Sequence, residues 1–177
     1  MSELQPFEAN GMPLSPGIRL LEASAGTGKT FALAHLVLRL LSEGARPLTI
    51  EQLLVVTFTE AAAAELRDRI ARRLQAALGL LEAEASARSM EAPAPPADQP
   101  LAQWREALGP VPDPTLRGRL LLALEQLDRA DITTIHGFCR RTLQRQALEA
   151  GLGPAVALES RAAERRSQIV HDYWQQQ

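Results

Sequence analysis

The stretch that decides the fold is LLEASAGTGKT, which occupies residues 20–30. The apolar residues at its start predict a strand over residues 18–22, followed by a glycine-bearing turn and a helix that begins near Lys29. A turn of this kind binds phosphate, because its backbone N–H groups converge on an anion and the helix N-terminus adds the positive end of its dipole. The stretch therefore predicts a phosphate-binding loop for a nucleotide.

The side chains of this loop suit the same chemistry. Gly26 and Gly28 allow positive φ and a close approach of the backbone to the phosphates. Lys29 would place its ammonium at the β- and γ-phosphates, and the hydroxyl of Thr30 would ligate Mg²⁺. Lys29 is the only lysine among 19 lysine and arginine residues, as expected where a compact charge fits and a planar guanidinium does not. Ala23 stands where the general pattern has glycine, so this position must avoid positive φ.

Length and composition limit the class of protein. The chain has 177 residues, 46% of them hydrophobic, and a formal net charge of −2. Any contact with nucleic acid must therefore come from a local basic patch. The single cysteine, Cys139, excludes an intramolecular disulfide, and the sequence contains neither a signal peptide nor an apolar run of membrane-spanning length. These features predict a cytoplasmic protein without a membrane segment.

Strands and helices alternate along the chain. Strands are expected at 18–22, 53–57 and 131–135, and the continuous apolar run 53–57 is typical of a strand buried on both faces. Helices are expected at 29–43, from 60 to beyond 78, at 101–108, 116–129 and 136–150, and from about 160 onward. An Ala/Pro linker is expected at 86–100. This order predicts an α/β fold with a doubly wound parallel sheet, which binds ligands at the carboxyl ends of its strands.

The second strand–helix junction carries Thr57, Phe58 and Thr59. Thr59 is well placed to cap the helix, and Glu60 suits the positive end of the helix dipole. Free N–H groups and threonine hydroxyls there would hold a backbone phosphate of a nucleic acid. A well-capped helix with an alanine-rich packing face explains the same residues equally well.

The third junction carries Thr134, His136, Gly137 and Phe138. Gly137 permits a close approach, Phe138 offers a ring on which a base can stack, and His136 offers a polar contact. The competing interpretation is a structural histidine beside a core phenylalanine.

Arginines follow both junctions, at positions 67, 69, 72 and 73 and at positions 140, 141 and 145. They would supply a positive field for a phosphate backbone or form an ordinary solvated face.

Taken together, three motifs resemble those of superfamily 1 DNA helicases of the UvrD/Rep type. They are EASAGTGKT at 22–30, LLVVTFTEAAAAELRDRI at 53–70 and TTIHGFCRRTL at 133–143. Glu22 before the loop, TFTEAA in place of TFTNKA, and HGFC in place of HSF point within that superfamily to the RecB family of helicase–nuclease subunits. The resemblance covers roughly residues 18–82 and 130–152.

The resemblance implies a P-loop NTPase with a RecA-like motor domain. It implies ATP hydrolysis coupled to 3′→5′ movement on single-stranded DNA, exonuclease activity, and double-strand break repair by recombination with RecC-like and RecD-like subunits. The residues implied for ATP are Ala23, Ser24, Ala25, Gly26, Thr27, Gly28, Lys29, Thr30 and Phe31, with Lys29 and Thr30 as the catalytic residues and Thr30 as the Mg²⁺ ligand. The residues implied for DNA are Thr57, Phe58, Thr59, Thr134, His136, Gly137 and Phe138.

The organisation that follows has three parts: an irregular lead-in at 1–17, the N-terminal part of a RecA-like domain at 18–150, and the start of a helical insertion at 151–177. The family's adenine-contacting glutamine has no counterpart ahead of the loop, because Gln5 lies too far upstream. No strand ends in Asp-Glu to orient the attacking water. We therefore expect an N-terminal portion of a longer subunit, which by itself binds nucleotide weakly and hydrolyses it negligibly.

Two alternatives remain open at this point. One is a truncated or non-catalytic nucleotide-dependent DNA-binding module, which the missing Asp-Glu pair favours. The other is a helicase of the AddA or UvrD type.

Overall fold

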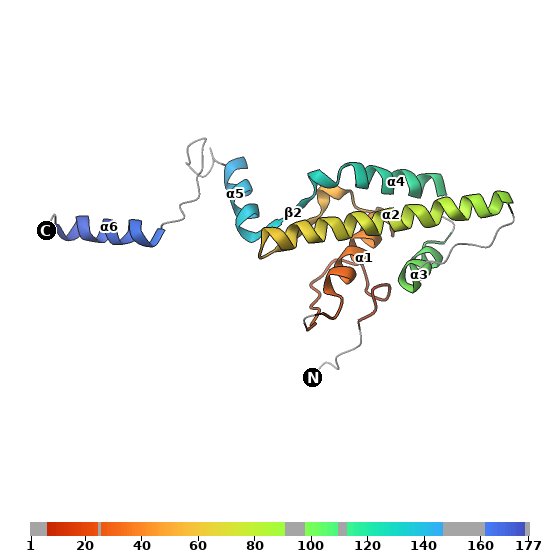
Figure 1. The fold of residues 1–177 in the computed structure, drawn as a ribbon, viewed down its shortest axis with the longest axis horizontal. Helices are drawn as coiled ribbons and strands as arrows, with labels where there is room; N and C mark the ends of the chain where they lie inside the picture. The colour runs from red at the N-terminus through yellow and green to blue at the C-terminus, as the bar shows by residue number, and fades with distance from the viewer. Residues whose placement is uncertain (1–6, 25, 91–97, 110–112, 147–161, 176–177) are drawn as a thin grey trace. The chain divides into compact units, whose positions relative to one another are not determined.

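The computed structural model describes residues 7–24, 26–90, 98–109, 113–146 and 162–175. The chain divides into two compact units, Met1–Thr134 and Ile135–Gln177. The first unit contains, in order, α1 Lys29–Ser42, the 3₁₀ turn η1 Ile50–Gln52, β1 Leu54–Thr57, α2 Glu60–Met90, α3 Gln99–Ala107, α4 Asp113–Glu125, the 3₁₀ turn η2 Leu127–Arg129 and β2 Asp131–Thr134 (Figure 1). The second unit contains α5 Ile135–Arg145 and α6 Ala162–Gln175.

The sheet of the first unit has two parallel strands among the described residues, β1 and β2, which pair from Leu54 with Asp131 to Thr57 with Thr134. The α/β class with a parallel sheet is thus confirmed in this small form. The strand predicted at 18–22 is wrong, because this segment forms no ladder and leaves Ile18 97% and Leu20 84% exposed. β-propensity alone does not make a strand, since each strand needs a partner for its backbone N–H and C=O groups.

The prediction that 53–57 is buried on both faces is also wrong. Leu54 and Val56 are exposed, whereas Leu53 just before the strand is buried. β2 is the more enclosed strand, since Ile132, Thr133 and Thr134 are all buried. One face of β1 therefore remains open among the described residues.

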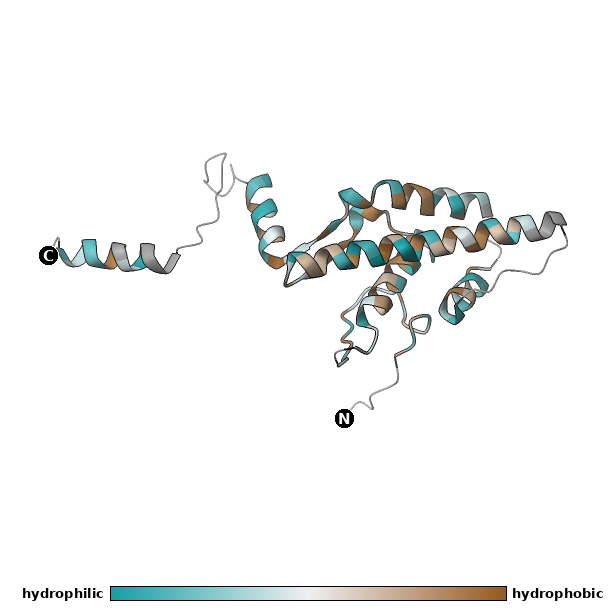
Figure 2. Ribbon diagram, viewed as in Figure 1, coloured by the Kyte–Doolittle hydropathy of each residue, from teal (hydrophilic) through white to brown (hydrophobic). Residues whose placement is uncertain are grey.

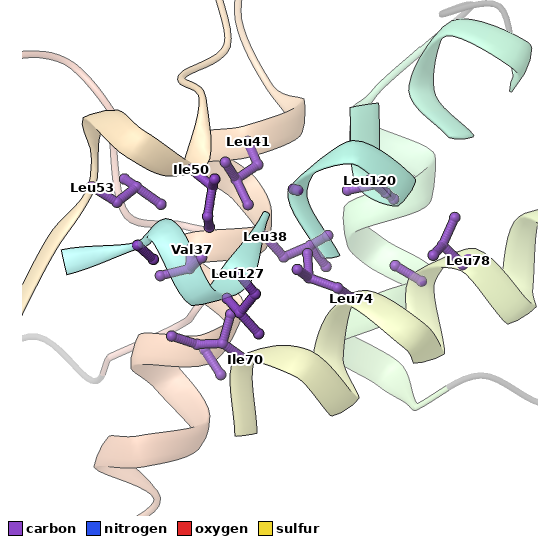
Figure 3. Close-up of a cluster of buried hydrophobic side chains, with 14 of the residues drawn as sticks. Val37, Leu38, Leu41, Ile50, Leu53, Ile70, Leu74, Leu78, Leu120 and Leu127 are labelled. Atoms are coloured by element: carbon purple, nitrogen blue, oxygen red, sulfur yellow. The ribbon is translucent and has the colours of Figure 1, made fainter. Parts of the chain in front are cut away.

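The core lies where α2 packs against α1 and α4. Apolar residues recur along these three helices between polar ones (Figure 2). Figure 3 shows the side chains that meet there, which include Val37, Leu38, Leu41, Ile50, Leu53, Ile70, Leu74, Leu78, Leu120 and Leu127. Aliphatic side chains dominate this core, as a sequence with 4% aromatic residues requires.

Local chemistry explains where two of the helices end or begin. Gly44, just past α1, has φ of 85°, the left-handed conformation expected after a helix C-terminus. Asp98 caps α3 by accepting a hydrogen bond from the Leu101 N–H at 2.8 Å. The predicted helices at 29–43, from 60 onward and at 101–108 are thus confirmed within a few residues.

Three other boundaries differ from the prediction. The linker expected at 86–100 is shorter, because α2 continues to Met90 and α3 begins at Gln99, and residues 91–97 lie outside the described ranges. The helix expected at 116–129 begins at Asp113 and ends at Glu125, after which the 3₁₀ turn η2 buries Leu127. β2 ends at Thr134, and Ile135 already belongs to α5.

The second unit contains the last two predicted helices. α5 begins at Ile135, and the part predicted at 147–150 lies outside the described residues. α6 begins at Ala162, and Ser160, where its start was predicted, also lies outside them. Its Ile169, Val170, Tyr173 and Trp174 are exposed.

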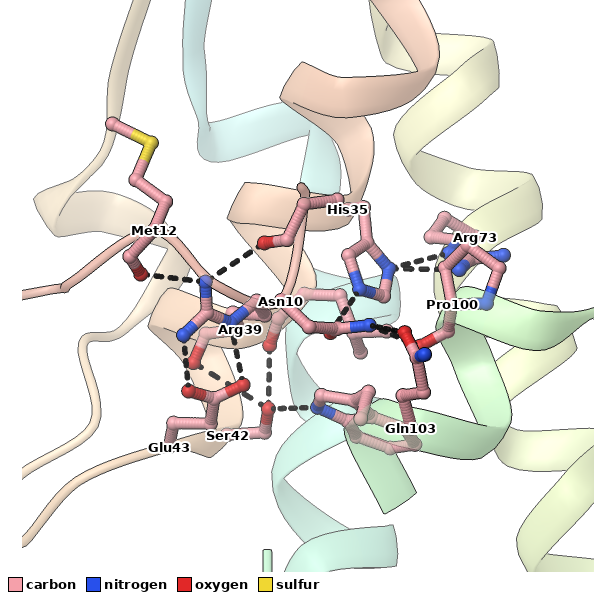
Figure 4. A network of polar contacts seen from close by, with 12 residues as sticks. Asn10, Met12, His35, Arg39, Ser42, Glu43, Arg73, Pro100 and Gln103 are labelled. Atoms are coloured by element: carbon pink, nitrogen blue, oxygen red, sulfur yellow. Dashed lines mark hydrogen bonds and ion pairs between the residues drawn. The ribbon is translucent and has the colours of Figure 1, made fainter. Parts of the chain in front are cut away.

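A buried polar network joins α1, α2 and α3 (Figure 4). The Arg73 guanidinium donates to His35 Nδ1, from Nε at 2.9 Å, and forms an ion pair with Asp98. Because Nδ1 accepts, the His35 proton is assigned to Nε2, which donates to Asn10 Oδ1 at 2.7 Å. On the next turns of α1, the Trp104 indole N–H donates to Ser42 Oγ at 2.9 Å. α1 therefore has polar side chains within its packed surface, and of these His35 and Ser42 are fully buried.

His35 is fully buried, and it is neutral near pH 7. Burial, and after it the positive charges of Arg73 and Arg39, lower the pKa of His35 to about 4 from 6.5. The unfolded chain therefore takes up a proton as the pH falls below 6.5, while the folded chain resists it until about pH 4.

We predict that the free energy of unfolding decreases as the pH falls through this window, by about 3 kcal/mol in total from His35. Urea unfolding at a series of pH values from about 7 to about 4 measures the slope. The His35→Gln variant should have a shallower slope, whereas His136→Gln, at an exposed histidine, should keep the wild-type slope. Equal slopes for the His35→Gln variant and the wild type would contradict the assignment.

Candidate functional site

The predicted phosphate loop opens α1 with two left-handed glycines. Gly26 has φ of 79°, and Gly28, the residue before the first helical turn, has φ of 85°. Gly28 provides no side-chain cap, and the first backbone bond of the helix runs from the Ala32 N–H to the Gly28 carbonyl at 2.9 Å. Among the described residues, the N–H groups of the first turn therefore remain free of a side-chain cap and available to an anion.

The lysine of the loop turns back toward the loop itself. Lys29 Nζ donates to the carbonyl oxygens of Ala23 and Ser24, both at 2.8 Å. The Thr27 hydroxyl donates to the same Ser24 carbonyl at 2.7 Å. The ammonium is thus held beside the loop backbone, where phosphate oxygens would be stronger acceptors than neutral carbonyls.

A pocket of about 500 Å³ lies against this loop. Its polar side is formed by loop residues, and its apolar side comes from the segment before the loop, from α1 and from the lead-in. The residues that line it are Phe7, Leu21, Glu22, Ala23, Ser24, Thr27, Gly28, Lys29, Ala32, Leu33 and Leu36. Its volume is within the usual range for small-molecule sites.

Five of the residues predicted for ATP line this pocket: Ala23, Ser24, Thr27, Gly28 and Lys29. Gly26, Thr30 and Phe31 do not line it, and Ala25 lies outside the described residues. Thr30 is half-buried in the first turn of α1. The groups at this pocket that could contact a phosphate are therefore the loop backbone and the Lys29 ammonium.

The Phe31 side chain contacts His35 and Arg73 of the buried polar network. Its ring stacks on His35, with centroids 6.2 Å apart and planes 2° from parallel. The guanidinium carbon of Arg73 lies 4.8 Å from the Phe31 ring centroid, which is cation–π distance. The buried polar network thus reaches the residue directly after Thr30.

The junction between β1 and α2 presents an aromatic ring to solvent. Phe58 is 86% exposed, and Thr59 next to it is exposed as well. Thr59 caps α2 as predicted, because its hydroxyl accepts from the Ala62 N–H at 3.1 Å. The Thr59 hydroxyl oxygen therefore accepts from the helix, and the Phe58 ring beside it is open to a ligand.

Thr134 ends β2 and pairs in register with Thr57. It is buried, and its hydroxyl donates to Glu60 Oε1 at 2.9 Å. Glu60 thereby links the start of α2 to the end of β2. From the sequence, Glu60 is expected only as a favourable charge at the helix N-terminus, because its partner Thr134 lies 74 residues away.

The remaining residues predicted for DNA belong to α5 in the second unit. His136 is exposed, whereas Gly137 and Phe138 are half-buried. The sequence favours a buried, small apolar role for Cys139, but its side chain is exposed.

The arginines after the second junction do not form one basic surface. Arg73 is buried in the polar network, and Arg67 donates to the Ile132 carbonyl at 2.9 Å. Arg69 pairs with Glu65 at 3.2 Å, with both side chains about half exposed. Neither interpretation fits Arg73, which is buried, and Arg67 is held by a backbone carbonyl of β2.

The described residues contain neither a membrane span nor a cluster of metal ligands. No helix in the described ranges has the length and apolar character needed to cross a membrane. In the same part of the chain, no group of three His, Cys, Asp or Glu side chains could hold a metal ion.

Comparison with known proteins identifies relatives. The chain is 42% identical to the RecBCD enzyme subunit RecB of Escherichia coli over 170 residues, which is 92% of this chain and 13% of that protein. It is 36% identical to RecB of Mycobacterium tuberculosis H37Rv over 167 residues, 94% of this chain and 14% of that protein. It is 35% identical to an ATP-dependent helicase/nuclease subunit of Desulforudis audaxviator over 160 residues, 89% of this chain and 10% of that protein.

The chain thus spans 13–14% of the length of these RecB relatives. The model of the UvrD/REP helicase N-terminal domain matches residues 5–176, nearly the whole chain. The resemblance carried by the three motifs is confirmed, and the chain belongs to the UvrD/REP helicase N-terminal domain family.

Proposed function

We propose that this chain is the nucleotide-binding and single-stranded-DNA-binding portion of a RecB-like helicase–nuclease subunit. The observation that carries the proposal is the loop at 23–30, where two left-handed glycines and the only lysine of the chain meet an uncapped helix N-terminus at a pocket. ATP and Mg²⁺ would supply the hydrolysable phosphoanhydride and its charge neutralisation. Lys29 would bind the phosphates, and Thr30 would ligate the metal ion.

Binding by Lys29 would require an exchange of partners. The ammonium now donates to the Ala23 and Ser24 carbonyls, and a triphosphate would replace both neutral acceptors by charged ones. The free N–H groups after Gly28 would bind the phosphates from the same side. The loop would then hold the triphosphate with no change in the helix that follows.

The proposed fold of the longer protein is RecA-like. Such a fold has a larger parallel sheet than the two described strands, and it would bury apolar side chains that are exposed here. The exposed Ile18 and Leu20 side chains and the open face of β1 support this proposal, because such apolar surface is stabilised by burial.

The DNA-binding part of the proposal rests on the exposed ring of Phe58. An isolated, almost fully exposed phenylalanine at the carboxyl end of a strand offers a stacking face to an unpaired base. Thr57 and Thr59 flank it, and in the second unit His136, Gly137 and Phe138 would add contacts. Thr134 would act through Glu60, because its hydroxyl is buried and donates to that carboxylate.

The activities proposed for the longer protein are ATP-dependent 3′→5′ unwinding and exonuclease action in double-strand break repair. RecC-like and RecD-like subunits are its proposed partners, because the relatives are named as subunits of the RecBCD enzyme. For the present chain alone we propose binding of nucleotide and single strand, without significant hydrolysis.

We predict that Lys29→Ala lowers the affinity for Mg·ATP by about tenfold or more, because it removes one charge-assisted contact. Isothermal titration calorimetry of wild type and variant measures this change. Lys29→Arg should not restore binding, since the guanidinium lacks the compact shape of the ammonium. An unchanged Kd for Lys29→Ala would refute the assignment of the loop.

Chemical labelling provides an independent check of the same site. Pyridoxal phosphate followed by borohydride reduction labels primary amines, and Lys29 carries the only ε-amine of the chain. Mg·ATP should protect Lys29 and leave the labelling of the α-amine unchanged. Equal labelling of Lys29 with and without Mg·ATP would count against phosphate binding at this lysine.

We predict that Phe58→Ala weakens binding of an oligothymidylate by about tenfold, the loss expected for one base–aromatic stacking contact. Fluorescence anisotropy with a labelled strand measures the Kd, and the salt dependence should remain as in wild type. Leu122→Ala, at an exposed residue of α4, is the surface control. If Phe58→Ala binds as tightly as this control, Phe58 does not contact the strand.

A further inference from the structure

The lead-in before the phosphate loop is fixed to the fold by side chains, although its sequence reads as irregular. Asn10 receives the Nε2–H of His35 at 2.7 Å. Its amide donates to the Pro100 carbonyl at 2.9 Å and to Gln103 Oε1 at 3.1 Å. Asn10 is thus held between α1 and α3, as Figure 4 shows.

A second anchor lies one turn further along α1. Arg39 Nη1 donates to the carbonyl oxygens of Ala9 at 2.8 Å and Met12 at 2.7 Å. The guanidinium is oriented by Glu43, which accepts from Nε at 2.7 Å and from Nη2 at 2.9 Å. Because Arg39 is buried, these contacts fix the backbone of residues 9–12 firmly on α1.

This anchoring places Phe7 at the pocket of the phosphate loop. Phe7 lies two residues before Ala9, is 41% exposed and lines the same pocket as Lys29. Leu33 and Leu36 of α1 line its apolar side. The pocket therefore combines a phosphate-binding loop with an aromatic ring and aliphatic walls.

We propose that Phe7 forms the base subsite of the nucleotide site, by stacking its ring on the base of a bound nucleoside triphosphate. This inference rests on the proposed nucleotide-binding function and extends it to the recognition of the base. It also accounts for how a base is held in a chain without a glutamine at the usual place ahead of the loop. A ring and aliphatic side chains contact the faces of a base and leave its hydrogen-bonding edge unread.

The subsite has a consequence for specificity. Stacking depends on the π-face that every base has, so ATP and GTP should bind with similar affinity. Purines should bind more tightly than pyrimidines, because they offer a larger face. Inorganic tripolyphosphate should bind to the loop with an affinity that does not depend on Phe7, because it has no base.

The test compares Mg·ATP, Mg·GTP, Mg·UTP and Mg·tripolyphosphate on the 177-residue chain by isothermal titration calorimetry. Phe7→Ala should weaken ATP and GTP by about tenfold, weaken UTP less, and leave tripolyphosphate unchanged. Phe7→Tyr keeps an aromatic ring and should keep the wild-type affinity for ATP. Phe7→Leu keeps an apolar side chain without a ring and should lie between the wild type and Phe7→Ala.

The surface control is Leu122→Ala, which should match the wild type for every ligand. An unchanged affinity of Phe7→Ala for ATP would overturn the base subsite. So would an equal loss for ATP and tripolyphosphate, because Phe7 would then only support the loop. A strong preference of the wild type for ATP over GTP would likewise overturn it, since the base edge would be read. Wild-type protein that binds neither ATP nor tripolyphosphate would instead refute the proposed function itself.

Discussion

The buried guanidinium of Arg73 is the constraint on which the first unit depends. It projects from α2 and contacts His35 and the Phe31 ring of α1 and the carboxylate of Asp98, which also caps α3. A buried charge is tolerated only when its hydrogen bonds and its counter-charge are in place together. The three helices must therefore dock in one relative position, and α1, which begins at the candidate phosphate loop, is held by these contacts.

The same constraint explains why His35 stays neutral. A protonated imidazole would stand beside two positive guanidinium groups in a site closed to water, and burial with these charges lowers the pKa of His35 to about 4. As a neutral ring, His35 accepts from Arg73 on one nitrogen and donates to Asn10 on the other. His35 thus links the Arg73 guanidinium to Asn10 of the lead-in, the segment that also contains the pocket residue Phe7.

Features with local causes could be predicted from the sequence, and those with distant causes could not. Helix α1 was predicted at nearly its observed length because Gly28 and Gly44 mark its two ends. The strand at 18–22 was wrong because its formation depends on partners that local sequence does not encode. The contact of Glu60 with Thr134 and the anchoring of Asn10 join residues 74 and 25 or more positions apart, so only the folded chain reveals them. In the candidate site, the loop could be predicted, whereas Phe7 could not, because nothing in an irregular lead-in indicates where it folds back.

The two glycines of the loop have backbone conformations of the left-handed type, which L-residues rarely adopt. An added Cβ at Gly26 or Gly28 would meet no described atom within 4 Å beyond the chain neighbours, although both residues have φ near 80°. An L-alanine at either position would thus have room, but its chirality would oppose the backbone by about 1–2 kcal/mol. The backbone at these two positions therefore depends on the stereochemistry of single residues, because no described neighbouring atom excludes a side chain there.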